Sequence, residues 1–451
     1  MTTRVTVREH ARLTTDALAE PTLDRAYVSP TAFDWLCGLN AGFTRAGASL
    51  VHVEGRRWLA LDNYVGVLET PCGTSIEILP KHVDDDAAAG DDIASRALLK
   101  RMISATSGLR AREAGPASLD RFDAPLSEWL MGRFLSALDY LVKRGVRSDY
   151  ARVEAAERFL RGQLDIARQM RQPAGRAHVF QFRHEVFLPD RAENRLLKLA
   201  LEQVARATKM PSQWQLASEL RSLLHAIPAS RDVDSDFRLW RNDRLMAHYQ
   251  PLRPLCELIL HRQMPLALRG AWHGISMLFP MEKLFERYVA GVLARQLPTG
   301  ARLRTQPSSA SLCRHLDGDA FRLEPDLLIE YGSRKWVLDA KWKRLDGSDR
   351  GNLYGLAQSD FYQLFAYGHK YLGGRGEMAL IYPCTRKFPA PLPSFAFGHG
   401  LTLRAMPFDL ESDRLIGGEQ FGLPLGGHAM SNTIDVIDTI ETIEANGLAS
   451  G

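Results

Sequence analysis

The chain has 451 residues, which is long for one hydrophobic core and predicts roughly two to four domains. The apolar fraction of 45% and charged fraction of 24% are those of a globular protein, and a net charge of +4 excludes a uniformly basic surface. Five scattered cysteines form no CxxC or Cys/His motif, which argues against a zinc site and favours a reducing, cytoplasmic compartment. No secretory signal and no run of about eighteen apolar residues is present, so no membrane contact is expected.

Residues 1–92 are predicted to form a β-rich N-terminal domain with one helix from Thr31 to Leu39. The stretches 49–55, 57–70 and 74–83 alternate apolar and polar residues, which is typical of strands. The run DDDAAAGDD at 84–92 is acidic and rich in alanine and glycine, and it indicates a boundary loop.

Residues 93–270 are predicted to form a helical middle domain. Apolar residues recur at helical spacing in several segments, the clearest of which runs from Leu126 to Leu141 and ends at Gly145. Basic residues outnumber acidic ones between 141 and 176, and this segment either follows a phosphate backbone or forms a solvated helical face. Asn194 is interpreted as a structural hydrogen-bonding residue. The polar residues 232–237 are expected to interrupt the helices.

The segment from Glu324 to Arg344 carries the strongest chemical signal. Two β-rich runs are joined by Gly332-Ser333, a pair that predicts a two-residue hairpin turn. Centring the turn there places Asp326 across from Asp339, and directly opposed residues share a face of the hairpin. Lys341 lies two positions beyond Asp339 and therefore points the same way.

Two carboxylates and one ammonium group are thus expected at one end of the hairpin. Carboxylates this close repel each other and favour a compensating cation, and oxygen ligands suit Mg²⁺. Apolar residues on both faces of the two runs predict strands that are covered on both sides. The alternative is an ordinary hairpin with a solvated Asp-Lys pair.

Two predicted helices flank this hairpin in the sequence. The first begins at Met281 and carries Glu282 and Glu286, of which the helical wheel favours Glu282 as the inward carboxylate. The second runs through SDFYQLFAYGHKY, with Ser359 or Asp360 as its cap and Gln363 and Tyr367 on one face. The stretches 376–385 and 401–410 are predicted to be strands that extend the sheet. The segment 411–451 is expected to be a tail that either docks as a short amphipathic segment or is disordered.

These residues resemble the motifs of a known protein family. Pro325-Asp326 followed by Asp339-Ala340-Lys341 resembles the PD-(D/E)xK nuclease pattern, and Gln363 with Tyr367 resembles the Q-x-x-x-Y element of its RecB-like branch. The wording VLDAKWK followed by DFYQLFAYGHKY is similar to the McrC family, the nuclease subunits of McrBC-type modification-dependent restriction systems. The resemblance implies an α/β (α+β) multidomain protein. Its residues 271–410 would form a restriction-endonuclease-like domain, with a central mixed sheet flanked by helices.

This resemblance also implies a function. Asp326, Asp339 and Glu286 would bind Mg²⁺ (or Mn²⁺), because the superfamily favours the glutamate after Phe285. Lys341, Gln363 and Tyr367 would complete a site that hydrolyses double-stranded DNA in antiphage defence. The implied partner is a McrB-like AAA+ GTPase hexamer, which the chain would stimulate, and residues 1–92 would contact that partner or DNA. The chain has no G-x-x-x-x-G-K-[ST] loop of its own. The alternatives are a stand-alone RecB-like repair nuclease and a catalytically inactive scaffold.

Overall fold

The computed structural model describes residues 3–45, 49–55, 57–81, 91–106, 125–260, 276–316 and 318–426. Most of the predicted acidic loop and the end of the predicted tail lie outside the described residues. The chain divides into two compact units, which are described separately. Unit 1 comprises Met1–Lys81 and Ala89–Pro280, and unit 2 comprises His82–Ala88 and Met281–Gly451. This division differs from the predicted one, because the β-rich and helical regions share unit 1 and the boundary follows Pro280.

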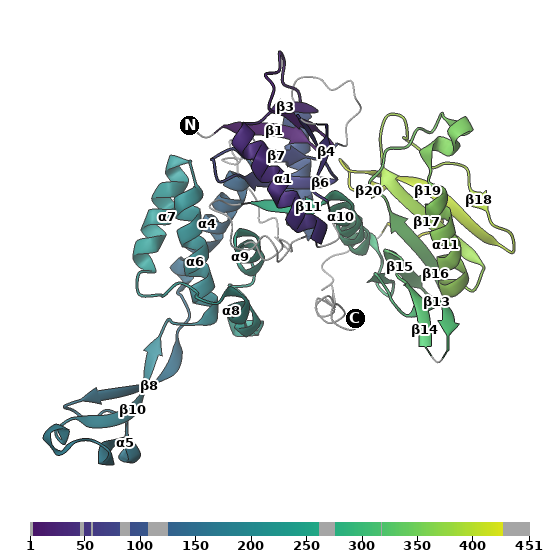
Figure 1. Cartoon of the computed structure of the whole chain (residues 1–451). Helices are drawn as coiled ribbons and strands as arrows, with labels where there is room; N and C mark the ends of the chain where they lie inside the picture. Colours follow the sequence, from purple (N-terminus) through teal and green to yellow (C-terminus); the bar gives the residue numbers. More distant parts are fainter. Residues whose placement is uncertain are drawn as a thin grey trace. The chain divides into compact units, whose positions relative to one another are not determined.

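Unit 1 contains two four-stranded sheets, with strand orders β1-β7-β6-β11 and β3-β2-β5-β4 (Figure 1). The strands are β1 (Arg4–Arg8), β2 (Arg12–Thr14), β3 (Arg25–Tyr27), β4 (Val51–Glu54), β5 (Trp58–Leu61), β6 (Tyr64–Glu69), β7 (Ser75–Leu79) and β11 (Met277–Pro280). Both sheets and helix α1 (Pro30–Arg45) contribute to one core, which includes Val7, Leu36 and Ile76. The predicted β-rich region with one helix is confirmed, and β1 to β3 are additional to the predicted strands.

Helices make up most of the remainder of unit 1. They are α2 (Asp91–Thr106), α4 (Leu126–Arg144), α6 (Ala192–Ala207), α7 (Pro211–Leu223), α8 (Val233–Leu239), η3 (Arg244–Met246) and α9 (Arg253–Ile259). The predicted end of one helix at Gly145 is confirmed, since α4 stops there and Gly145 has a φ of +99°. The expected break at 232–237 is wrong. Asp232 caps α8 by accepting a hydrogen bond from the Ser235 backbone, so the polar residues begin a helix.

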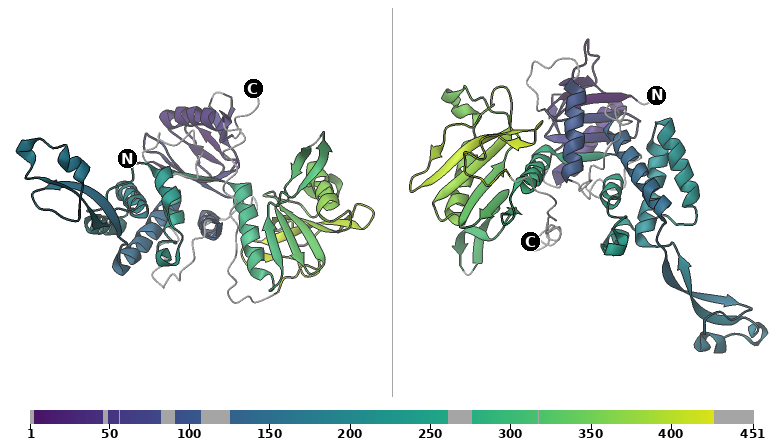
Figure 2. Two further views of the ribbon diagram at one scale, coloured as in Figure 1. Left: turned by 90° about the horizontal axis from the view of Figure 1, so that it is seen from below. Right: turned by 180° about the vertical axis from the view of Figure 1, so that it is seen from behind.

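Residues 149–188 form a β-structure that we call the arm, and the prediction of helix for this part of 93–270 is wrong. Its elements are β8 (Asp149–Glu157), β9 (Gln163–Leu164), α5 (Ile166–Met170), η2 (Ala174–Arg176) and β10 (Phe180–Leu188). The sheet order is β8-β10-β9, and Figures 1 and 2 show the arm extending away from the helices of unit 1. Its strands are mostly exposed or half-buried, and β10 has apolar residues at the alternating positions Phe180, Phe182, Val186 and Leu188, which is typical of a strand.

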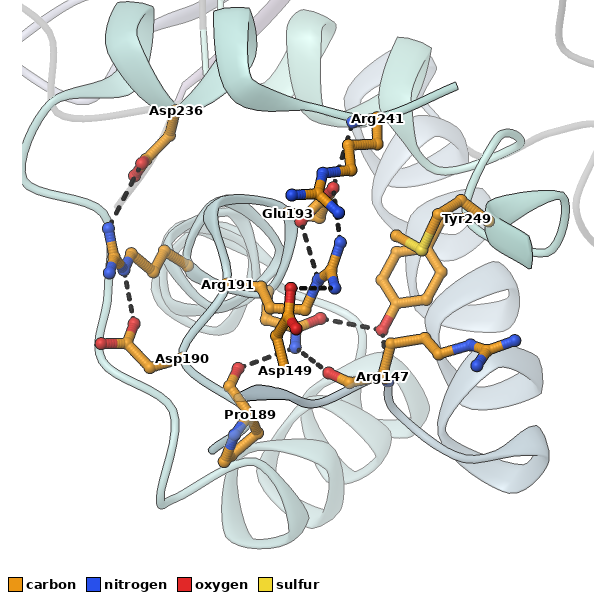
Figure 3. Close-up of polar contacts among 12 residues, drawn as sticks. Arg147, Asp149, Pro189, Asp190, Arg191, Glu193, Asp236, Arg241 and Tyr249 are labelled. Carbon is orange, nitrogen blue, oxygen red and sulfur yellow. Dashed lines mark hydrogen bonds and ion pairs between the residues drawn. The ribbon is translucent and has the colours of Figure 1, made fainter. Parts of the chain in front are cut away.

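A polar network holds both ends of the arm to the helices (Figure 3). Asn194 on α6 donates through Nδ2 to the carbonyl oxygens of Arg147 and Pro189, at 2.8 Å each, just before and just after the arm. The Tyr249 hydroxyl donates to Asn194 Oδ1 and accepts from the Arg147 backbone N–H. Asn194 and Tyr249 are 1% and 0% exposed. The interpretation of Asn194 as a structural hydrogen-bonding residue is therefore confirmed.

Unit 2 is built on a mixed sheet with the order β12-β15-β16-β17-β19-β18, and β20 pairs with β19. Strands β16, β17 and β19 run parallel, whereas β15 is antiparallel to β16. The strands of the unit are β12 (Arg302–Thr305), β13 (Ala310–His315), β14 (Gly318–Leu323), β15 (Leu327–Tyr331), β16 (Arg334–Ala340), β17 (Gly376–Pro383), β18 (Phe395–Ala396), β19 (Leu401–Asp409) and β20 (Arg414–Leu415). The predicted strands after residues 376 and 401 are confirmed.

Helices cover both faces of this sheet. Helix α11 (Gln358–Tyr371) packs through Leu364 on the face that carries Val337, and η5 (Arg350–Gly355) precedes it. Helix α10 (Met281–Gln296) packs on the opposite face, where Phe285 contacts Phe408. Phe421 is 1% exposed, so the first part of the predicted tail belongs to this unit. The mixed α/β multidomain architecture is confirmed. In the described part of the chain, no helix has the length and apolarity needed to cross a bilayer.

Candidate active site

The predicted hairpin is present in unit 2, and its turn lies at Gly332-Ser333. Gly332 has a φ of +58°, a left-handed conformation that a residue without Cβ adopts at no steric cost. Strands β15 and β16 pair in the predicted antiparallel register. Just before the start of β15, Asp326 Oδ2 accepts a hydrogen bond from the Ala340 backbone N–H at 2.8 Å. Asp326 and Asp339 therefore lie at the same end of the hairpin.

Asp339, near the end of β16, is the most deeply buried carboxylate of the site, with 1% of its surface exposed. Neither of its side-chain oxygens has a hydrogen-bond partner among the described residues. Lys341 Nζ lies 2.7 Å from Oδ2, which is close enough for an ion pair without the alignment of a hydrogen bond. Burial raises the pKa of Asp339, and the charge of Lys341 offsets only part of this effect. The carboxylate is thus compensated incompletely, which is costly in a protein interior.

Asp326 and Lys341 respond to the same electrostatic environment. Burial, followed by the charges of Asp339 and Glu286, raises the pKa of Asp326 to about 7. Burial lowers the pKa of the Lys341 ammonium, but Asp339, Asp326 and Asp360 together outweigh this effect and the net pKa is raised. Lys341 therefore remains a cation at neutral pH, while Asp326 is partly protonated there, and a bound metal cation would favour its ionised form.

Helix α10 brings Glu286 to these carboxylates. Glu286 is 7% exposed, whereas Glu282 lies one turn earlier and is exposed. Glu286 Oε1 accepts from Gln306 Nε2, and Oε2 accepts from Lys283 Nζ, at 2.8 Å each. The Gln306 backbone N–H also donates to the carbonyl oxygen of Asp326. The structure places Glu286 at the site and Glu282 at the surface, although the helical wheel alone favours Glu282.

Helix α11 places Gln363 and Tyr367 next to Lys341. Gln363 Oε1 accepts from Lys341 Nζ at 3.5 Å, and Gln363 Nε2 donates to the Tyr367 hydroxyl at 2.7 Å. The Tyr367 hydroxyl in turn donates to the carbonyl oxygen of Glu324 at 3.1 Å. This chain of contacts runs from the ammonium group to the residue before Pro325. It fixes the position of Lys341 relative to the hairpin.

The donor set suits a hard divalent cation. Asp326, Asp339 and Glu286 offer only carboxylate oxygens, which Mg²⁺ prefers, and neither Asp339 oxygen accepts a hydrogen bond from the described residues. Even so, no three Asp, Glu, His or Cys side chains in the described ranges are gathered closely enough to hold a metal ion. Asp326 and Glu286 are held by protein donors instead. The residues fit the chemistry of the ion, and its binding would exchange those contacts.

Comparison with known proteins places this site in a family. A family model described as "McrBC 5-methylcytosine restriction system component" matches residues 59–383. The chain belongs to the McrBC family. The matched segment contains every site residue that the sequence predicts, and the family resemblance read from the motifs is confirmed. No curated protein matches the chain.

Two solved structures of McrBC assemblies from Thermococcus gammatolerans have a similar fold. One is a refined half-complex from a tetradecameric assembly of McrB AAA+ hexamers with bound McrC. Its TM-score is 0.68 at 20% identity, with 93% of this chain and 98% of the matched chain covered. The other is a cryo-EM structure of the McrBC complex, with a TM-score of 0.50 at 22% identity, covering 65% of this chain and 88% of that chain. At these identities the likeness shows the fold alone.

This McrBC chain has a further carboxylate at the site that its sequence does not single out. Asp360 lies in the first turn of α11, and its charge acts on Asp339 and Lys341. Its Oδ2 accepts from the Tyr382 hydroxyl at 3.5 Å. Its expected role as helix cap is wrong, because Ala357 is the N-cap residue. One feature of the sequence could have identified Asp360 as a site residue. It lies three residues before Gln363 and therefore on the same face of the helix.

Proposed function

We propose that this McrBC chain is a metal-dependent endonuclease subunit that resembles McrC and hydrolyses DNA phosphodiesters. The observation that carries the proposal is the buried Asp339 carboxylate, which accepts no hydrogen bond from the described residues and has Lys341 beside it as an ion-pair partner. A buried carboxylate without hydrogen bonds lowers the stability of the fold, and binding of a cation would compensate its charge. The match to the PD-(D/E)xK pattern and a mixed sheet covered by α10 and α11 support a place in that nuclease superfamily.

The residues of the site have distinct roles in this proposal. Asp326, Asp339 and Glu286 would hold Mg²⁺, or Mn²⁺ in its place. A cation bound there polarises the phosphodiester and lowers the pKa of a water molecule. Lys341 stays protonated and stabilises negative charge on the nucleophile and on the phosphate as the bond breaks. Gln363 accepts from Lys341 Nζ and keeps the ammonium directed at the carboxylates.

We further propose a McrB-like AAA+ GTPase hexamer as the partner. The family match supports a component of a restriction system, and the solved relatives are assemblies of McrB AAA+ hexamers with McrC. The chain itself contains no P-loop motif, so nucleotide-driven translocation would need another protein. The proposal includes stimulation of the GTPase of that partner by this chain.

A cleavage assay tests the proposal. Purified chain is incubated with modified plasmid DNA and Mg²⁺, with and without a McrB-like AAA+ GTPase and GTP. We expect cleavage only in the complete mixture, and Asp339→Asn should reduce its rate by at least about a hundredfold, because a metal ligand is lost. Glu330→Gln is the matched control, since Glu330 lies on the same hairpin and is paired with Arg304 and Lys335.

The other outcomes distinguish the alternatives. Metal-dependent cleavage without the GTPase indicates a stand-alone RecB-like nuclease. Binding to the GTPase without cleavage under any divalent cation indicates a scaffold. Cleavage by Asp339→Asn at the wild-type rate contradicts the assignment of the site.

A further inference from the structure

Strands β13 and β14 form a two-stranded sheet of their own, separate from the main sheet of unit 2 (Figure 1). We call these two strands, together with Leu316, the ribbon. Three large apolar side chains of the ribbon are exposed: Leu312 by 46%, Leu316 by 87% and Phe321 by 74%. Leu312 and Phe321 lie between two paired positions of the strands, Ser311 with Arg322 and Cys313 with Ala320. A short hairpin that exposes apolar residues in this way is typical of a binding surface.

The backbone of the ribbon is strained at two of these residues. Leu316 and Phe321 have φ values of +51° and +56°, in the left-handed region. This conformation costs roughly 1–2 kcal/mol for a residue other than glycine. Neither residue recovers that cost by burial in this chain, since both are mostly exposed. Strain of this kind persists where a binding site requires the geometry.

The base of the ribbon is tied to the helix that supports the candidate active site. The Tyr371 hydroxyl, on α11, donates to the carbonyl oxygens of Pro307 and Leu323, which lie just before β13 and at the end of β14. Tyr371 follows Gln363 and Tyr367 at intervals of four residues, so the three side chains lie along one helical face. The eight-residue interval from Gln363 to Tyr371 corresponds to roughly 12 Å of helix.

Duplex DNA is a surface that such a ribbon can contact. Two-stranded β-ribbons enter the major groove of B-form DNA, and apolar wedges occur in the minor groove. Helix α11 contacts both Lys341 and the base of the ribbon, so a duplex bound by the ribbon would be held by the same helix that contacts Lys341.

The charges beside the apolar residues also fit DNA. Arg314 and Arg322 lie on the ribbon and are exposed, and Arg302 is exposed where β12 begins. Arg314 is 76% exposed, and Asp319 lies 3.8 Å away as an equally solvated partner, so this ion pair is weak. Exposed guanidinium groups around an apolar tip suit a groove lined by phosphates.

We propose that the ribbon enters a groove of duplex DNA and so positions the phosphodiester that is to be cut. Leu316 and Phe321 contact the bases and sugars, and Arg314 and Arg322 contact the phosphates. This inference rests on the proposed function, because it assigns the duplex to the same unit as the carboxylates.

Fluorescence anisotropy with the full-length chain tests this inference. The probe is a labelled duplex of mixed sequence, titrated in EDTA so that cleavage does not interfere. The double variant Leu316→Ser/Phe321→Ser should bind about tenfold more weakly, the loss expected for one aromatic contact with a base. The matched control is Phe159→Ser, because Phe159 in the arm is 76% exposed, close to the value for Phe321. This control should bind like the wild type.

A second pair of variants tests the phosphate contacts. Arg314→Ala/Arg322→Ala should weaken binding at low salt and reduce the slope of log affinity against log salt by about 2, one for each lost contact. Lys143→Ala is the control for charge, because Lys143 is paired with Asp139 in unit 1. A slope that is unchanged in the double arginine variant contradicts the inference.

Failure of this inference and failure of the proposed function give different results. If Asp339→Asn abolishes cleavage while the ribbon variants bind and cut DNA like the wild type, the ribbon assignment is wrong and the nuclease assignment stands. If the ribbon variants change the oligomeric state by sedimentation but leave DNA affinity unchanged, the ribbon is a protein interface. If the wild type binds the duplex no more tightly than the ribbon variants, the inference is overturned.

Discussion

Replacing Asp339 with asparagine removes one charge from the candidate site and leaves the side-chain volume almost unchanged. The pKa of Asp339 is raised by burial, and the pKa of Asp326 is raised to about 7 by burial and then by the charge of Asp339. A carboxyl whose pKa is higher in the folded than in the unfolded state loses its contribution to stability as pH rises through the folded value. For Asp326 the loss of stability takes place over the pH range between its ordinary pKa of 3.8 and its folded-state pKa of about 7.

The magnitude follows from this pH range. One pKa unit corresponds to about 1.4 kcal/mol, so the wild type should lose at most roughly 4 kcal/mol of unfolding free energy through the titration of Asp326. The two carboxyls titrate together, so this loss belongs to the pair. Burial is the larger cause and the charge of Asp339 the second. We therefore expect Asp339→Asn to be more stable than the wild type by about 1 kcal/mol near pH 8 without metal, and not near pH 5.

Urea unfolding in EDTA at several pH values measures this difference, with Glu330→Gln as the control. Excess Mg²⁺ should then stabilise the wild type more near pH 8 than near pH 6, because protons compete with the cation, and should stabilise Asp339→Asn much less. An asparagine variant that is less stable than the wild type near pH 8 in EDTA would refute the reasoning. Equal stabilisation of both proteins by Mg²⁺ would refute it as well.

Three further substitutions test other parts of the structure. Glu286→Gln should reduce DNA cleavage by about a hundredfold and Glu282→Gln should not, measured by plasmid nicking, and the opposite result would return the role to Glu282. Gln363→Ala should lower the rate at saturating DNA by about tenfold and keep the stabilisation by Mg²⁺, because it loosens Lys341 without removing a ligand. Asn194→Ala should destabilise unit 1 by about 2 kcal/mol in urea, since it leaves buried backbone carbonyls unpaired, while the stabilisation by Mg²⁺ remains.

The hairpin shows which part of the site can be predicted from sequence. Its register depends on a local turn, and the Gly332-Ser333 pair fixes that turn because few residues adopt a positive φ. Once the turn is set, the alternation of strand residues brings Asp326 and Asp339 together. The helix that carries Gln363 follows from its four-residue spacing for a similar reason. In these cases the information lies within about twenty residues of sequence.

The parts that could not be predicted depend on contacts between distant residues. Strand β11 pairs with β6, with Met277 opposite Val67. No local sequence pattern predicts that these two distant strands pair. The arm is different, because the alternation of Phe180, Phe182, Val186 and Leu188 is a local strand signal within the segment predicted to be helical. Asp360 carries no motif of its own, and it becomes visible only when α11 packs beside Asp339 and Tyr382.

Helix α11 connects the proposed chemistry with the proposed DNA contact. Its residues Gln363, Tyr367 and Tyr371 hold Lys341, the carbonyl of Glu324 and the base of the ribbon in turn. Because all three lie on one helical face, a rotation or shift of the helix moves all three contacts together. A duplex held by the ribbon would therefore be placed relative to Lys341 by a single rigid element. This is the precision that a positioned phosphodiester requires, since small displacements from reactive geometry cost large factors in rate.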